Sequence, residues 1–220
     1  MITQSMNKLV SLPEVVEKLK DGMTIMVGGF LNSGAPLAIL NAIADSGVKN
    51  LTLICNDAGF VDKGVGKIIA NGQVKKLITS YVGSNPSAID FMNNSQMEVE
   101  FSPQGTLIER IRAAGAGLGG VLTPTGLGTS VENGKQIITV DSKKYLLETP
   151  LKADISLVGA SISDNEGNLH YKGTTRNFNP MVAMAADIVI AEAEEIVETG
   201  QLNPDLVHTP AILIDFIYNK

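Results

Sequence analysis

The sequence is poor in the residues that usually build catalytic and metal centres. Its 220 residues include one cysteine, two histidines and no tryptophan. A single cysteine rules out an internal disulfide and fits a reducing compartment. His170 and His208 lie in no metal-ligand spacing with each other or with Cys55, so we expect no metal site. We expect structural roles for both histidines and an inert core thiol for Cys55.

Long apolar runs and an excess of positive charge are also missing. No stretch approaches the ~18 consecutive apolar residues of a membrane span, and the N-terminus lacks the apolar core and cleavage site of a signal peptide. The net charge is -6, whereas a nucleic-acid binder needs a basic stripe. We therefore expect a cytoplasmic protein that binds neither membranes nor nucleic acids. With 44% apolar residues, the chain can bury a sizeable core.

Strand-like and helix-like segments alternate along the first half of the chain. A capping box of Ser11 and Glu14 begins a helix that should run to about Lys20, and Gly47 should end the next helix. The predicted strands are 23–27, 51–55, 74–82 and 97–101, and the other helices are 36–46, 64–72, 86–94 and 106–115. This alternation predicts an α/β fold, an open and mostly parallel sheet with helices on both faces.

The second half adds a β-hairpin elaboration and two buried strands. Residues 134–148 form two strand-like runs around Asp141-Ser142, which indicates an antiparallel hairpin. Two apolar segments, 153–160 and 186–193, each begin with Ala-Asp-Ile, and a helix near 179–186 should lead into the second. Nothing resembles a linker, so we expect a single domain over residues 1–220.

A glycine-rich stretch, IMVGGFLNSGAP, follows the first strand at residues 25–36. Ligands of open α/β sheets bind beyond the carboxyl ends of strands, and the next helix should begin near Pro36. A helix N-terminus with free amides, approached through glycines, is an anion site, so we expect a phosphate, a pyrophosphate or an oxyanion here. Gly29 and Gly34 have P-loop spacing, but Ala35 and Pro36 replace the required Lys and Ser/Thr, which argues against nucleotide hydrolysis.

A second glycine-rich segment, 112–129, carries almost no charge. Gly115, Gly117 and Gly120 have the spacing of a dinucleotide fingerprint, yet they follow a helix and not a strand, so an NAD site is disfavoured. Surface loops are usually more polar. We therefore expect this segment to pack against another backbone or a ligand.

No nucleophile and base can be paired from the sequence. There is no G-x-S-x-G elbow, and Glu109 and Arg112 have the spacing of an ion pair on a helix surface. Glu132 precedes Asn133-Gly134 and could present a carboxylate on a tight turn. Asn-Gly is itself a hairpin signal, so we favour a solvated turn at this place.

Residues 21–36, DGMTIMVGGFLNSGAP, resemble the signature of family I coenzyme A transferases at every position. Further segments resemble landmarks of the alpha subunits of short-chain 3-oxoacid CoA-transferases, with the acetate–acetoacetate and butyrate–acetoacetate enzymes closest in appearance. These segments are YVGSNP (81–86), 102–120, LTPTGLGT (122–129) and TRNFNP (175–180). The resemblance therefore covers most of the chain and implies a CoA-transferase-like fold.

The resemblance implies a ping-pong transfer of CoA between carboxylic acids. A glutamate attacks the acyl-CoA thioester and becomes an enzyme-glutamyl-CoA thioester through an anhydride. In split enzymes of this kind the glutamate lies in the beta subunit, so no catalytic nucleophile is expected in this chain, and Glu132 is not given that role. The implied partner is a beta subunit, in a heterotetramer of two alpha and two beta chains. CoA is a substrate, and no tightly bound cofactor is implied.

The resemblance also assigns residues to the site. Gly28, Gly29, Phe30, Leu31, Asn32, Ser33 and Gly34 would bind CoA, with backbone amides facing CoA or the thioester oxygen. Gln104 and Gly117 are expected near the acyl pocket. Two alternatives stay open: a stand-alone module that binds CoA or a phosphorylated metabolite, and another enzyme of the same broad fold, such as a sugar-phosphate isomerase.

Overall fold

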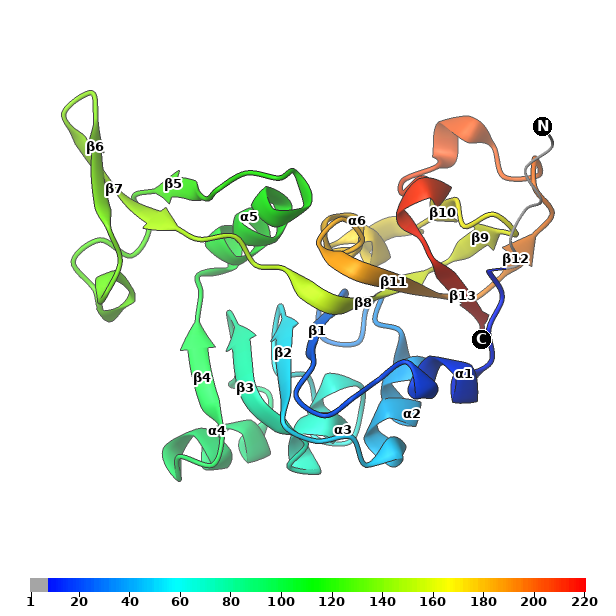
Figure 1. Ribbon diagram of the computed structural model, residues 1–220, viewed down its shortest axis with the longest axis horizontal. Coiled ribbons are helices and arrows are strands. Elements are labelled where there is room, and N and C mark those ends of the chain that lie inside the picture. The colour runs from blue at the N-terminus through cyan, green and yellow to red at the C-terminus, as the bar shows by residue number, and fades with distance from the viewer. Residues whose placement is uncertain (1–7) are drawn as a thin grey trace.

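A seven-stranded parallel sheet forms the centre of the computed structural model, which describes residues 8–220 (Figure 1). The strand order is β13-β11-β8-β1-β2-β3-β4, so the chain builds outward from β1 first on one side and later on the other. The strands are β1 (Thr24–Val27), β2 (Leu51–Cys55), β3 (Val74–Thr79), β4 (Glu98–Phe101), β8 (Ala153–Ala160), β11 (Ala186–Ala193) and β13 (Phe216–Asn219). A topological switch point therefore lies at β1, where α/β sheets open a crevice for ligands.

Helices cover both faces of this sheet, as the alternating pattern predicts. One face carries α1 (Leu12–Glu17), α2 (Leu37–Ser46), α3 (Val65–Ala70) and α4 (Pro86–Asn93), and the other carries α5 (Gln104–Gly115) and α6 (Asn179–Val182). The side chains of β1 alternate between the two cores, with Ile25 and Val27 in the first and Met26 in the second. All three are buried, which explains why this strand is apolar after Thr24.

Several local signals act as predicted. The Ser11 N–H donates to Glu14 Oε2 at 2.7 Å, which completes the capping box, and Gly47 ends α2 with a φ of 77°. The helix expected to reach Lys20 ends earlier, at Glu17. The helix expected over 179–186 ends at Val182, because Ala186 already pairs with Ala153 in the sheet. Sheet pairing overrides helical spacing there.

Short elements were missed by the sequence pattern. β13 extends the main sheet beside β11, and a small second sheet has the order β10-β9-β12. Its strands are β9 (Ile162–Asp164), β10 (Leu169–His170) and β12 (Ile196–Val197), and single 3₁₀ turns occur at Ser130–Glu132, Gly173–Arg176, Pro204–Leu206 and Ala211–Leu213. Runs of two to four residues are too short to show a period of two.

The hairpin elaboration is a three-stranded antiparallel sheet that projects from the body (Figure 1). We call it the arm, residues 121–148. It contains β5 (Val121–Thr123), β6 (Ile137–Val140) and β7 (Lys143–Glu148) in the order β5-β7-β6. Asp141 and Ser142 form its tip with φ values of 46° and 65°, the left-handed pair that a two-residue hairpin turn requires. The predicted hairpin is confirmed, with one additional strand.

Ionic contacts anchor the arm to the body. Glu148 at the end of β7 is buried, and its Oε1 accepts from Lys135 Nζ at 2.6 Å. Its Oε2 lies 3.8 Å from Arg110 Nε in α5. Arg110 Nη1 donates to Glu100 Oε1 of β4 at 2.8 Å. The network thus joins the arm to α5 and β4. A carboxylate can be buried when cationic groups lie beside it, and this one has two such neighbours.

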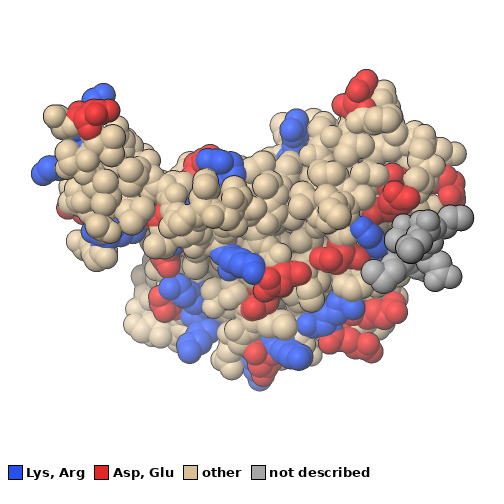
Figure 2. Space-filling view, turned by 45° about the horizontal axis from the view of Figure 1, so that its top comes forward, with Lys and Arg blue, Asp and Glu red and all other residues tan. Residues whose placement is uncertain are grey.

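Charges of both signs are interspersed over the face seen in Figure 2. None of the helices within residues 8–220 combines the length and the apolar character that a membrane span requires. Over the same residues, no group of three His, Cys, Asp or Glu side chains is arranged to hold a metal ion.

A buried carboxylate from β11 caps α2. Glu192 of β11 accepts the backbone N–H groups of Ala38 at 3.2 Å and Ile39 at 2.9 Å. Burial raises the pKa of Glu192 above its ordinary value of 4.5, although these two donors and Lys220 act in the opposite direction. The cap therefore places a negative charge at the positive end of the α2 dipole at a cost in desolvation.

This cap predicts a pH-dependent difference between the wild type and Glu192→Gln. A folded-state pKa above the unfolded value makes the free energy of unfolding fall as the pH rises from 4.5 through the raised value. The glutamine keeps a carbonyl acceptor and does not ionise. From pH 4.5 upward, the urea midpoint of Glu192→Gln should therefore rise relative to that of the wild type. Glu17→Gln, on the exposed side of α1, is the matched control and should show no such trend. A constant difference for Glu192→Gln would contradict the prediction.

Candidate functional site

The segment that leaves β1 is a compact turn at the switch point. We call residues 28–34 the glycine loop. Phe30 and Ser33 exchange two backbone hydrogen bonds, each 3.0 Å long, around Leu31 and Asn32. Leu31 has a φ of 51°, a left-handed conformation that non-glycine residues seldom adopt. The Phe30 side chain is 47% exposed at the tip of this turn.

Two of its glycines are required by packing within the chain. A Cβ on Gly28 would lie 1.9 Å from Asn179 Oδ1, and one on Gly34 would lie 2.3 Å from the carbonyl oxygen of Thr175. Gly34 also has a φ of 70°. Contact with residues 175–179 thus explains much of the glycine content that the sequence suggested was needed for a ligand.

Two asparagines from residues 175–180 hold the glycine loop in place. The Asn179 side chain is fully buried, donates to the carbonyl oxygens of Gly34 at 2.9 Å and Thr175 at 2.8 Å, and accepts from the Gly159 N–H at 3.1 Å. Asn177 Nδ2 donates to the Ser33 carbonyl oxygen at 3.0 Å. Two separate motifs that the sequence singled out, GGFLNSG and TRNFNP, therefore form one unit.

The expectation of an anion site at the α2 N-terminus is wrong. Its first amides, on Ala38 and Ile39, already donate to the carboxylate of Glu192. In the glycine loop, by contrast, the backbone N–H groups of Gly29, Asn32 and Gly34 have no hydrogen-bond acceptor among the described residues. The donors left for a ligand come from the loop itself.

Gln104 begins α5 beside the tip of the glycine loop. Its Nε2 donates to Asn56 Oδ1 at 2.7 Å, and Asn56 itself is buried at the end of β2. A cavity of about 390 Å³ opens at this point, within the size range of small-molecule pockets. It is lined by Phe30, Leu31, Asn56, Asp57, Ser80, Tyr81 and Gln104. The carboxyl ends of β1, β2 and β3 and the start of α5 therefore converge on one cavity.

Gln104 and Gly117, both expected near the acyl pocket, do not line the same cavity. Gln104 is the first residue of α5 and Gly117 follows its last turn, so the helix separates them by about 18 Å. A Cβ on Gly117 would meet nothing within 4 Å, and Gly117 does not line the cavity of Gln104. Elsewhere in the same segment, Gly115 packs against Met184 and Gly120 against the Glu148 carbonyl oxygen. Close backbone packing thus accounts for part of this segment.

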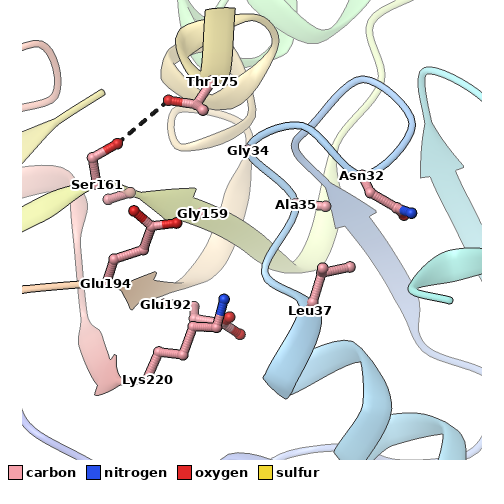
Figure 3. A pocket seen from close by; sticks show the side chains of 11 residues that line it. Asn32, Gly34, Ala35, Leu37, Gly159, Ser161, Thr175, Glu192, Glu194 and Lys220 are labelled. Carbon is pink, nitrogen blue, oxygen red and sulfur yellow. Dashed lines mark hydrogen bonds between the residues drawn. The ribbon is translucent and has the colours of Figure 1, made fainter. Parts of the chain in front are cut away.

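A second and smaller pocket, of about 80 Å³, lies on the other side of the glycine loop (Figure 3). Gly34 and Ala35 line one side, and Gly159 and Ser161 line another. The Ser161 and Thr175 hydroxyls face each other at 3.5 Å. Glu192, whose carboxylate caps α2, also lines this pocket, so the glycine loop and the α2 cap border the same pocket.

The polar pair Asn56-Asp57 and the turn that follows it were not predicted from the sequence. Residues 59–64, GFVDKG, repeat the pattern of residues 29–34, GFLNSG, and we call them the twin turn. Phe60 and Lys63 bridge the twin turn as Phe30 and Ser33 bridge the glycine loop. The glycines at both ends of each turn have positive φ. The repeated Gly-Phe-x-x-x-Gly spacing was the signal that could have revealed this second loop.

The other residues considered as chemical groups have local roles. Glu132 Oε2 accepts the Gly128 N–H at 2.6 Å within the arm, and Glu109 pairs with Arg112 at 2.6 Å on α5. His170 and His208 stack with their ring centres 4.8 Å apart. Burial raises the pKa of the Cys55 thiol, which lies in the core. These contacts agree with the structural roles expected for these residues.

Comparison with known proteins assigns the chain to a family. The coenzyme A transferase family profile matches residues 10–220. The chain is 53% identical over 210 residues to acetate CoA-transferase subunit alpha of Escherichia coli K12, which covers 96% of both proteins. It is 52% identical over 214 residues to the acetoacetyl-CoA:acetate/butyrate CoA transferase alpha subunit of Clostridium acetobutylicum, covering 97% of this chain and 98% of that subunit.

Solved structures agree with the fold. An acyl-CoA transferase from Escherichia coli O157:H7 superposes with a TM-score of 0.89 at 22% identity, over 99% of this chain and 47% of that one. The chain thus spans about half the length of that enzyme. Glutaconate coenzyme A-transferase from Acidaminococcus fermentans gives a TM-score of 0.83 at 19% identity, over 96% of this chain and 75% of that one. Sequence and fold together show that this chain belongs to the coenzyme A transferase family.

Proposed function

We propose that this chain is the alpha subunit of a short-chain 3-oxoacid CoA-transferase that moves CoA between acetyl- or butyryl-CoA and acetoacetate. The observation that carries the proposal is the cavity beside Gln104, which opens against the tip of the glycine loop at the carboxyl ends of β1, β2 and β3 in a coenzyme A transferase fold. The names of the two similar alpha subunits support acetate, butyrate and acetoacetate as substrates. Residues 1–220 act as one domain of the enzyme.

The nucleophile is a glutamate of a beta subunit in this proposal. Its carboxylate attacks the thioester carbonyl carbon, the CoA thiolate leaves, and an acyl-glutamyl anhydride forms. The thiolate then attacks the glutamyl carbonyl, which releases the carboxylic acid and leaves a glutamyl-CoA thioester. A second acid reverses these steps. The alpha chain supplies binding and electrostatic stabilisation, which fits a chain whose own Glu132 is occupied in the arm.

The glycine loop, residues 28–34, contacts CoA or the thioester oxygen. Gly29, Asn32 and Gly34 retain backbone N–H groups without an acceptor in the described chain, and donors fixed in advance are the effective form of oxyanion stabilisation. Gln104 meets the acyl group in the cavity, where Asn56 orients its side chain. CoA enters as a substrate, and the reaction needs no tightly bound cofactor.

The working enzyme is a cytoplasmic heterotetramer of two alpha and two beta chains in this proposal. The single, buried Cys55 suits a reducing compartment. The alternative, a stand-alone module that binds CoA, is distinguished by calorimetry with CoA on the isolated chain. Equal and tight binding with and without the beta subunit would favour the module.

Turnover should require both subunits. Acetoacetate with acetyl-CoA or butyryl-CoA should be converted by the mixture, and neither chain should act alone. Glu132→Gln should change kcat/KM by less than about twofold, because this carboxylate lies in the arm. Turnover by the alpha chain alone, abolished by Glu132→Gln, would overturn the placement of the nucleophile.

Gln104→Ala, assayed in the complex, should lower kcat/KM by about 10-fold, because one hydrogen bond to the acyl group is worth about 1 to 1.5 kcal/mol. The KM for the carboxylic acid should change more than the KM for the acyl-CoA. Gln96→Ala, at an exposed position before β4, is the matched control. Equal kcat/KM values for the two variants would remove Gln104 from the acyl pocket.

A further inference from the structure

We infer that Asp57 is a positioning residue that holds the glycine loop in its working conformation through the backbone N–H of Leu31. This inference rests on the proposed function of the loop. Asp57 follows β2, whereas Leu31 follows β1, so the contact joins two separate loops of the site. The Asp57 side chain does not need to touch the reacting atoms for this role.

The Asp57 carboxylate is buried and accepts hydrogen bonds from both loops and from Asn56. Its Oδ2 accepts the Leu31 N–H at 2.8 Å and Asn56 Nδ2 at 2.7 Å. Its Oδ1 accepts the Gly59 N–H at 2.9 Å. The residue is 5% exposed, so these bonds compete little with water. One carboxylate therefore connects the glycine loop to the first residue of the twin turn.

The bond coincides with the one non-glycine residue of positive φ in the glycine loop. Leu31 has a φ of 51° at a turn position where glycine is favoured. Such a conformation persists when surrounding contacts over-determine it. Its neighbours Phe30 and Ser33 are already paired with each other, so the Leu31 N–H is the loop's additional attachment to the body on this side.

The twin turn provides an internal comparison. Val61 occupies the place of Leu31, and it is not among the described residues with positive φ. No carboxylate accepts its N–H among the described residues. The two turns share their glycines and bridges but differ at this residue, and the difference accompanies the Asp57 contact. We read the strain at Leu31 as a conformation that Asp57 maintains.

The strained turn faces the cavity of the site. Phe30 and Leu31 line it together with Asn56, whose Oδ1 holds Gln104. Asn56 Nδ2 donates to the same Asp57 oxygen that accepts from Leu31. Asp57 thus positions both the loop tip and Asn56, the residue that orients Gln104. Small displacements of such groups lower the reaction rate.

A double-mutant cycle in the complex with the beta subunit tests the inference. Asp57→Asn should lower kcat/KM by about 10-fold, mainly through kcat, since a misplaced loop loses stabilisation of the transition state. Leu31→Gly removes the need to hold a strained residue. In that background Asp57→Asn should therefore cost less than about threefold. Asp90→Asn, exposed on α4, is the control and should leave kcat/KM unchanged.

Equal losses from Asp57→Asn in the two backgrounds would overturn the inference, as would an unchanged kcat/KM in the Asp57→Asn variant. A role in stability alone would lower the urea midpoint and leave kcat intact, and this result would also overturn it.

Amide hydrogen exchange on the wild-type alpha chain needs neither a variant nor turnover. The Leu31 N–H should exchange more slowly than the N–H groups of Asn32 and Gly34, which have no acceptor in the described chain. Exchange of Leu31 as fast as Asn32 would contradict the contact itself. If the wild-type complex showed no CoA-transferase turnover, the proposed function would be wrong. The exchange rates would still test the contact between Asp57 and the Leu31 N–H, because they do not depend on turnover.

Discussion

The hydrogen bonds of the Asn179 carboxamide are the interactions on which the rest of the site depends. The carboxamide lies fully buried between the end of β8 and the glycine loop, and all its hydrogen bonds go to backbone groups. A buried amide in this position is stable only when each partner stays in place. Gly28 and Gly34 leave the space that this side chain and Thr175 occupy. The loop geometry is therefore set from behind, by the protein's own polar groups.

The same logic decides which donors a ligand can meet. Parallel strands ending at one edge leave many polar groups near one another, and most of them are satisfied internally. Glu192 takes the first amides of α2, and Asp57 takes those of Leu31 and Gly59. Three loop amides remain without an acceptor in the described chain. The donors available to a ligand are thus fewer than a glycine-rich turn before a helix would suggest, and they all belong to the loop.

Much of the fold could be predicted because its signals are local. The apolar runs at 23–27 and 51–55, the cap at Ser11 and the hairpin at Asp141-Ser142 each depend on a few neighbouring residues. The contacts that build the site could not be predicted in this way. Glu192 lies 154 residues from Ala38, and Asn179 lies 145 residues from Gly34, so no spacing in the sequence relates them. The separation of Gln104 from Gly117, by contrast, follows from the helix predicted over residues 106–115, which lies between them.

The arm gives the molecule two regions of unequal local stability. In the described arm strands Leu146 is the one buried apolar side chain, whereas almost every apolar residue of β1 and β2 is buried. The arm depends on its own antiparallel hydrogen bonds and on the ion pairs of Glu148. Segments with little apolar burial open at lower free energy than the core of a domain. In the isolated chain, proteases would therefore reach the arm while the parallel sheet stays intact.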